Sequence, residues 1–367
     1  MVDLVKDSEV ALYTDFDDRF LQYDKRLGIE RQALAEIPVI DFSAYVDGGS
    51  LAARQEVGRQ IRAACIDIGF FYLANHGISV AELDEVHKQA LRLFEMPPEP
   101  KEKMYKMPGS RLGIMRVGGD PADKNPDPAS DLKEVYGMMR DVMPGEPEAG
   151  RMGAGFNKWP DPKILPGFES FMKKQIDKRV TLSQQLVRAF ALSLALPETY
   201  FDEMHRFLGC TFVFNYYPAF KGRRLPTQWS ISPHSDYGSF TLLSQDALGG
   251  LQVRNAAGIW IDVPPIPGTF VVNIGDLFAI WTNDLYLPSL HRALNKAEIA
   301  RVSAPFFVYP QGTTVVECLE TCHGPDNPPL YDPRTAEAHV TSLIDQSRRT
   351  GRPGLTTRTA RRFQPVA

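Results

Sequence analysis

The feature that most constrains the fold is a series of short β-type segments in the second half of the chain. The first, 211–217, is rich in β-branched and aromatic residues, and Pro218 closes it. Similar runs follow at 239–243, 251–253, 260–263, 269–274 and 303–309, separated by the turns Gly249-Gly250, Pro264-Pro265, Pro267-Gly268 and Gly275-Asp276. Many short strands joined by regular turns are typical of sandwiches and barrels, so we predict a jelly roll.

The first half of the chain is predicted to be mixed and mostly helical. Residues 37–42 and 70–73 are short apolar runs of strand type. Ser50 precedes a helix, and Ser79 with Glu82 forms a capping box for the next one. Residues 104–165 are rich in Gly and Pro and predict long loops with one or two strands, before a long amphipathic helix that backs the main sheet.

Composition argues for a soluble, cytoplasmic protein. The chain has 41 basic and 45 acidic residues in 367, so it offers no electrostatic footprint for nucleic acid or a membrane surface. Its first residues lack the basic and apolar stretches of a signal peptide, and no apolar run approaches the length of a membrane span. The four cysteines are therefore expected to be reduced thiols.

Three residues have the types and order of a metal-binding set. His234 and Asp236 are two positions apart in a segment expected to be a strand, so both side chains would point to the same face. A later histidine, His291, would complete the 2-His-1-carboxylate set of non-haem Fe(II) oxygenases. A His-x-Asp pair alone is a weak signal, and the order of motifs that follows it strengthens the interpretation.

A second same-face pair, Arg301 and Ser303, lies ten residues beyond His291. Arginine offers a rigid fork for a carboxylate, and serine adds a hydroxyl donor. A metal corner next to a carboxylate clamp indicates an oxygenase that uses a keto-acid cosubstrate.

Eight motifs occur together in the order typical of one enzyme family. The chain resembles the isopenicillin N synthase-like branch of the Fe(II)/2-oxoglutarate-dependent dioxygenases over residues 37–330. The motifs are Ile37-Pro38-Val39-Ile40-Asp41-Phe42, Gly69-Phe70-Phe71-Tyr72 with Asn75-His76-Gly77, Asn215-Tyr216-Tyr217-Pro218, His234-Ser235-Asp236, Gly249-Gly250-Leu251-Gln252-Val253, Asn273-Ile274-Gly275-Asp276, His291-Arg292 and Arg301-x-Ser303.

The resemblance implies an α+β fold with a double-stranded β-helix (jelly-roll) core, an N-terminal helical region and flanking helices. It places Fe(II) on His234, Asp236 and His291, and the distal carboxylate of 2-oxoglutarate on Arg301 and Ser303, with Tyr217 and Asn215 assisting; O2 is the remaining cosubstrate. We expect an N-terminal arm at 1–36 and an N-terminal dioxygenase region with variable loops at 37–165. Backing helices at 166–205 precede the Fe(II)/2-oxoglutarate core at 206–316, and a C-terminal tail with a helix follows at 317–367.

The substrate is expected to be a small organic molecule whose identity the sequence leaves open. The best candidates to contact it are Tyr237, Phe306 and Phe212. Further candidates are Arg111, Ile114, Met115, Arg116, Tyr136, Phe214, Phe240 and the segment 285–290, most of which fit a core position equally well.

Several alternatives stay open at this point. The first is an isopenicillin N synthase-type oxidase that uses no keto-acid, the second an ethylene-forming variant, and the third a jelly-roll binding protein without turnover. Tyr217 could be a core aromatic residue. Cys318, Cys322 and His323 suggest zinc, but an ordinary loop explains them better because no second ligand pair accompanies them. The oligomeric state is also open.

Overall fold

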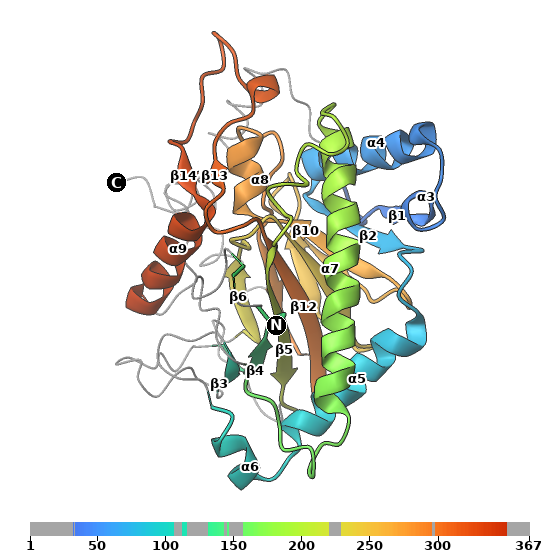
Figure 1. The fold of residues 1–367 in the computed structure, drawn as a ribbon, viewed down its shortest axis with the longest axis vertical. Helices are drawn as coiled ribbons and strands as arrows, with labels where there is room; N and C mark the ends of the chain where they lie inside the picture. The colour runs from blue at the N-terminus through green and yellow to red at the C-terminus, as the bar shows by residue number, and fades with distance from the viewer. Residues whose placement is uncertain are drawn as a thin grey trace, which may run out of the picture.

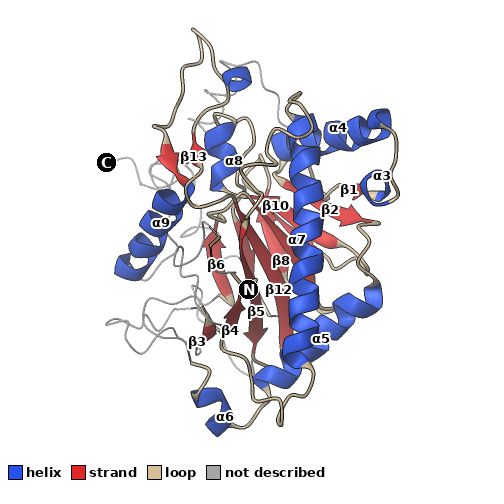
Figure 2. Cartoon of the chain, in the orientation of Figure 1, coloured by secondary structure: helices blue, strands red, loops and turns tan. Residues whose placement is uncertain are grey.

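The structure, a computed structural model, describes residues 32, 34–105, 112–115, 131–142, 145–146, 157–219, 229–295 and 298–350. Within these ranges two β-sheets and a set of helices build the fold (Figure 2). Most of the predicted N-terminal arm, the candidates Arg111 and Arg116, and the basic tail after residue 350 lie outside the described residues.

The larger sheet has eight strands in the order β1-β2-β10-β7-β12-β5-β4-β3. Only β1 and β2 run parallel, and every other neighbouring pair is antiparallel. The strands are β1 (Val39–Asp41), β2 (Phe70–Ala74), β3 (Gly113–Met115), β4 (Glu134–Met138), β5 (Gly209–Tyr217), β7 (Phe240–Gln245), β10 (Phe270–Ile274) and β12 (Arg301–Tyr309).

The smaller sheet has four antiparallel strands in the order β6-β11-β8-β9, namely β6 (Ile231–His234), β11 (His291–Ala293), β8 (Leu251–Arg254) and β9 (Trp260–Val263). A compact apolar cluster joins it to the larger sheet, and its members come from both, including Phe70, Val271, Val253 and Val263. Two packed antiparallel sheets of this kind confirm the predicted jelly roll. A small pair, β13 (Val315–Val316) and β14 (Arg334–Thr335), lies outside it.

Helices cover the opposite face of the larger sheet. The long helix α7 runs along that face (Figure 1), and its Phe190 ring lies 5.3 Å from the ring of Phe240 on β7. Nearly all of the main hydrophobic core lies between these helices and the sheet. The helices are α3 (Ser43–Val46), α4 (Leu51–Asp67), α5 (Val80–Phe94), α6 (Pro98–Glu102), α7 (Phe168–Ser193), α8 (Asp276–Trp281) and α9 (Ala336–Thr350), with a 3-10 turn η1 (Glu320–Cys322).

The helix starts follow from their capping residues. The Ser50 side chain accepts a hydrogen bond from the backbone of Ala53 at the start of α4. Ser79 and Glu82 form both bonds of the predicted capping box at the start of α5. The structure adds α8, where the sequence predicted only a turn at Gly275-Asp276, because six residues are too few for a periodic signal.

The cysteines and the lengths of the apolar helices bear on two further expectations. All four cysteines are free thiols, as predicted, and Cys65 and Cys210 are buried. Among the described residues, no helix is both long and apolar enough to cross a membrane.

Candidate metal centre and cosubstrate site

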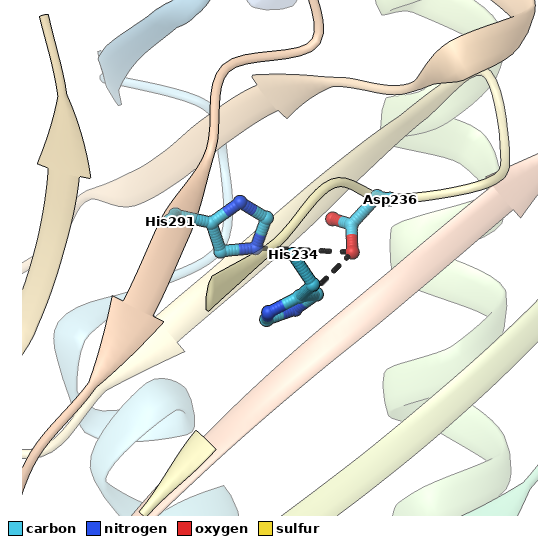
Figure 3. A group of neighbouring side chains, drawn as sticks. All are labelled: His234, Asp236 and His291. Atoms are coloured by element: carbon cyan, nitrogen blue, oxygen red, sulfur yellow. Dashed lines mark ion pairs between the residues drawn. The ribbon is translucent and has the colours of Figure 1, made fainter. Parts of the chain in front are cut away.

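The side chains of His234, Asp236 and His291 lie close together (Figure 3). Their ligand atoms all lie within 4.8 Å of one another. Asp236 Oδ1 is 3.9 Å from His234 Nε2 and 3.8 Å from His291 Nε2, so the three atoms point at a common centre. His234 and His291 are directly paired across β6 and β11, which explains how residues far apart in sequence come together.

The position of Asp236 differs from the predicted one. Strand β6 ends at His234, so Asp236 lies in the loop that follows and not on the strand. The backbone N–H of Asp276 donates to the carbonyl of Asp236 at 2.8 Å and holds this loop. Gly275 permits the contact, because a Cβ there would lie 2.2 Å from the carbonyl oxygen of Gly238. The carboxylate reaches the predicted partners by this turn and not by strand alternation.

Backbone carbonyls orient both histidine rings. His234 Nδ1 lies 2.8 Å from the carbonyl of Ser232, and His291 Nδ1 lies 3.2 Å from that of Ser289. A carbonyl only accepts, so each Nδ1 carries the proton and donates it. Each Nε2 is then left with a free lone pair facing Asp236, the arrangement a metal-bound histidine needs.

The two oxygens of the Asp236 carboxylate have different partners. Its Oδ2 accepts hydrogen bonds from Thr241 Oγ1 at 2.5 Å and from Asn273 Nδ2 at 2.6 Å. Its Oδ1 faces the two imidazoles. Thr241 and Asn273 thus orient the carboxylate so that one oxygen remains available to a metal ion.

The charge states of His234 and Asp236 also suit a divalent metal. Burial and the neighbouring His291 lower the pKa of His234 to about 4, so its ring is neutral near pH 7. Burial alone would raise the pKa of Asp236, but the two histidines and the hydrogen bonds from Thr241 and Asn273 outweigh it and lower that pKa. An ionised carboxylate beside a neutral imidazole is ready to bind Fe(II) without first losing a proton.

Arg301 lies on β12 with its side chain 2% exposed. Its Nε and Nη1 atoms have no hydrogen-bond partner in the part of the chain that the structure describes. The guanidinium lies over the Tyr217 ring at 4.5 Å, and Asp246 Oδ1 is 3.8 Å from Nε. A buried guanidinium with unused donors is costly unless an anion binds there, so this site fits a carboxylate.

Hydroxyl groups lie next to this guanidinium. Ser303 Oγ is 3.0 Å from the Tyr217 hydroxyl, and Asn215 Nδ2 donates to Ser303 Oγ at 3.4 Å. The register explains the cluster, since Arg301 pairs with Tyr217 and Ser303 with Asn215 across β12 and β5. All four residues predicted to hold the cosubstrate are therefore neighbours.

Gly250 makes room for Arg301. A Cβ at this position would lie 2.8 Å from Arg301 Nη1 and 2.0 Å from the Leu294 carbonyl oxygen, and its φ of +100° favours glycine. The predicted Gly249-Gly250 turn therefore lets backbone approach the guanidinium closely.

Two of the three preferred substrate candidates, Phe212 and Phe306, point away from the metal-ligand cluster. Phe212 and Phe306 are fully buried in the core under the helices, and the Phe212 ring packs against Arg179 of α7 at 4.6 Å. They alternate with Asn215 and Ser303 along their strands, so they face away from the metal cluster. Tyr237 directly follows Asp236 in the same loop and is partly exposed.

The wider set of candidates divides in the same way. Ile114, Tyr136, Phe214 and Phe240 belong to the helix-backed core, and Tyr286 of the 285–290 segment is buried with its hydroxyl donating to Ser193. Met115 lies on the other face, because it pairs with Val135 and Val135 pairs with Asn215. Phe307 also lies on that face, since it pairs with Thr241, which contacts Asp236. The sequence analysis named Phe306 as a substrate-contacting residue, whereas the neighbouring Phe307 is the one that lies on this face.

Other residues that shape the site carried only a faint signal. Asn273 is a lone polar residue in the fully buried apolar strand Phe270–Ile274, and Thr241 is a polar residue in the largely buried strand β7. A polar side chain in a buried strand must find a partner, which could have drawn attention to both. Cys318, Cys322 and His323 do not form a metal-binding group, as His234, Asp236 and His291 are the only such group among the described residues.

Comparison with known proteins agrees with this geometry. Residues 37–162 match the model of the non-haem dioxygenase in morphine synthesis N-terminal family, and residues 208–310 match the 2OG-Fe(II) oxygenase superfamily. The chain belongs to the 2OG-Fe(II) oxygenase superfamily. Its members use Fe(II), 2-oxoglutarate and O2, so this protein is a 2-oxoglutarate-dependent dioxygenase.

Named relatives come from fungi and plants. The 2-oxoglutarate-Fe(II) type oxidoreductase ppzC of Metarhizium majus is 35% identical over 320 residues, which is 82% of this chain and 85% of the relative. Homoarginine-6-hydroxylase 2-ODD-233 of Oryza sativa subsp. japonica is 33% identical over 302 residues, covering 78% of this chain and 89% of that enzyme.

Solved structures show the same fold with the cosubstrate bound. A full-length Neurospora crassa protein in complex with alpha-KG and thymine superimposes with a TM-score of 0.76 at 28% identity, covering 87% of this chain and 99% of that one. JOX2 in complex with 2OG, Fe and JA superimposes with a TM-score of 0.72 at 29% identity, covering 91% of both chains.

Proposed function

We propose that this enzyme couples the oxidative decarboxylation of 2-oxoglutarate to hydroxylation of a small organic metabolite in the cytoplasm. His234, Asp236 and His291 would hold Fe(II), and Arg301 with Ser303 would bind the distal carboxylate of 2-oxoglutarate. Tyr217 and Asn215 orient the Ser303 hydroxyl. Fe(II) bound at the three ligands would supply O2 activation at the expense of the keto-acid, which leaves as succinate and CO2.

The observation that carries this proposal is the buried Arg301 guanidinium with its unused donors, on the sheet face that also carries Thr241, the partner of Asp236. The protein has already lost the solvation of this charge, so a dianionic cosubstrate gains both an ion pair and hydrogen bonds there. With three protein ligands, Fe(II) held there would still be able to bind the keto-acid. The protein's remaining task is to hold one substrate C–H bond near the metal and to exclude competing reactions.

The test is an anaerobic titration of the metal-free protein with Fe(II) and then 2-oxoglutarate, followed through the weak visible metal-to-ligand charge-transfer band. We expect a saturable band that His234→Ala and Arg301→Ala each weaken. Iron binding without any band would instead favour the isopenicillin N synthase-type oxidase, in which Arg301 and Ser303 bind the substrate's own carboxylate. Screening for that enzyme would begin with carboxylate-bearing peptides.

Hydroxylation is the outcome that the proposal favours over desaturation or ring closure. Homoarginine-6-hydroxylases from rice and soybean are among the relatives, at 33% identity. Product analysis by mass spectrometry separates these outcomes, because hydroxylation adds one oxygen atom while desaturation and ring closure each remove two hydrogens.

A further inference from the structure

Two serines lie on either side of His234, and each is held by a carboxylate from another part of the chain. Ser232 precedes the histidine by two positions and contacts Asp131, and Ser235 follows it and contacts Asp276. We propose that Asp131 and Asp276, which are not metal ligands, are positioning residues that hold residues 232–236, the end of β6 and the loop after it, in their ligating shape. The inference rests on the proposed metal centre.

Asp131 makes the tighter contact. Its Oδ1 accepts from both the backbone N–H and the hydroxyl of Ser232, each at 2.7 Å. The carbonyl of the same serine accepts the proton of His234 Nδ1 at 2.8 Å. The carboxylate therefore fixes the peptide that sets the ring orientation and tautomer of His234.

Lys133 supports the Asp131 carboxylate from the other side. Its Nζ lies 3.3 Å from Asp131 Oδ2, and the two side chains are 17% and 25% exposed. A partly buried ion pair holds the carboxylate in one orientation better than an exposed one would.

Asp276 holds the other end of the loop. Its Oδ1 accepts from the Ser235 hydroxyl at 3.1 Å, and its backbone N–H donates to the carbonyl of Asp236 at 2.8 Å. The side chain is completely buried at the start of α8. Asp276 thus contacts both residues that follow His234.

His339 on α9 faces the second oxygen of Asp276. Its Nε2 lies 3.8 Å from Asp276 Oδ2, and the ring is 2% exposed. Neither ring nitrogen nor Asp276 Oδ2 has a hydrogen-bond partner among the described residues. At 3.8 Å, Nε2 and Oδ2 lie beyond direct hydrogen-bond distance, so the buried ring faces the carboxylate across a close contact.

The carboxylates of Asp131 and Asp276 have similar surroundings. Each carboxylate binds a serine with one oxygen and faces a nitrogen base with the other. Asp131 and Lys133 precede the oxygenase match at 208–310, and His339 follows it. Segments on both sides of the jelly-roll core therefore maintain the geometry of its metal ligands.

Ser232→Ala and Ser235→Ala test the proposal with the smallest possible change, since each removes only a hydroxyl. The matched control is Ser170→Ala, which removes a hydroxyl that contacts the Gly167 carbonyl at the start of α7. Two quantities are measured: the Fe(II) dissociation constant from the anaerobic titration, and hydrogen exchange of residues 230–239 in the metal-free protein. We expect each loop variant to raise the Fe(II) dissociation constant about tenfold and to speed exchange, while the control changes neither.

Substitutions at the supporting residues extend the test. Asp131→Ala is expected to weaken Fe(II) binding about tenfold, while Asp131→Asn, whose amide oxygen can still accept from Ser232, stays within about threefold of wild type. His339→Leu is expected to speed exchange around Ser235, and His339→Gln, which keeps a polar nitrogen facing Asp276, should keep the wild-type rate.

The results of these experiments would support or overturn the positioning role of Asp131 and Asp276. Fe(II) constants within about twofold of wild type in both serine variants, with unchanged exchange, would overturn the positioning role. An effect at Ser232 alone would remove Asp276 and His339 from the proposal. A wild-type protein that shows no charge-transfer band would instead defeat the proposed function, and exchange in the metal-free protein would still decide whether the carboxylates hold the loop.

Discussion

At the scale of single residues, the three metal ligands differ in what their loss should do. Asp236→Ala removes the only anionic ligand and leaves the Thr241 and Asn273 donors unpaired in a buried place. We expect no detectable 2-oxoglutarate turnover and no saturable Fe(II) binding at micromolar metal. The measurement is the anaerobic titration together with O2 consumption. Asp161→Ala, at an exposed turn carboxylate, is the matched control and should retain both activities.

Substitution of Arg301 should weaken binding of 2-oxoglutarate and leave Fe(II) binding unchanged. Arg301→Ala deletes the charge-assisted hydrogen bonds to a carboxylate, which corresponds to an increase of roughly 10- to 100-fold in the KM for 2-oxoglutarate. Arg301→Lys should recover only part of it, because an ammonium lacks the planar fork. Steady-state kinetics at saturating Fe(II) measures the change. An unaltered KM in the alanine variant would show that the carboxylate binds elsewhere.

Residue-level prediction was possible where chemistry restricts the residue type. Only a few side chains ligate iron or bind a carboxylate, so His234, His291 and Arg301 could be proposed from type and spacing. The orienting residues were not recognisable in that way. Asp131 and Asp276 carry ordinary charges in the sequence, and only the folded chain brings them to Ser232 and Ser235.

At the scale of the elements, β12 shows why the pocket could not be assigned from sequence. A half-exposed strand alternates apolar and polar residues, which reveals its buried face. Both faces of β12 are buried, one by the helices and the other by the jelly-roll interior, so the alternation disappears. Phe306 and Phe307 look equivalent in the sequence, although one packs in the core and the other lies on the face of the metal cluster.

This difference between neighbouring phenylalanines gives a prediction for β12. Phe306→Ala should lower the free energy of unfolding by about 3–5 kcal/mol, because a fully buried ring leaves a cavity. Its KM for 2-oxoglutarate should stay near the wild-type value. Phe307→Ala should cost less stability and change the KM for the organic substrate. Urea unfolding and steady-state kinetics of both variants separate the two effects, and a reversed pattern would show that the strand faces are misassigned.

At the scale of the whole molecule, the order of motifs predicted the family while the packing between distant segments stayed hidden. β2 and β10 are neighbours in the sheet although almost two hundred residues separate them in the chain. The family resemblance supplied such pairings indirectly. It offered nothing for α9, because the C-terminal helix lies outside the matched motifs, and its contact with Asp276 emerged only from the structure.

Buried histidines should make the stability of the whole molecule depend on pH. His205 is fully buried, with Nδ1 donating to the Phe201 carbonyl and Nε2 accepting from the Ser239 hydroxyl. Burial lowers its pKa to about 4, compared with 6.5 in the unfolded chain. Between these values the unfolded state binds the proton more readily than the folded state. The free energy of unfolding therefore falls as the pH drops from about 6.5 toward 4.

His205→Gln isolates this contribution, because it removes this one titrating group and leaves the other histidines in place. Between about pH 7 and pH 4.5 the wild type should lose roughly 2 kcal/mol more stability than the variant, given the two pKa values of His205. Urea unfolding of the metal-free proteins at several pH values measures the difference and avoids any change in metal loading. Parallel pH profiles for the two proteins would mean that His205 is protonated as easily inside the fold as outside it, which would contradict its hydrogen bond from Ser239.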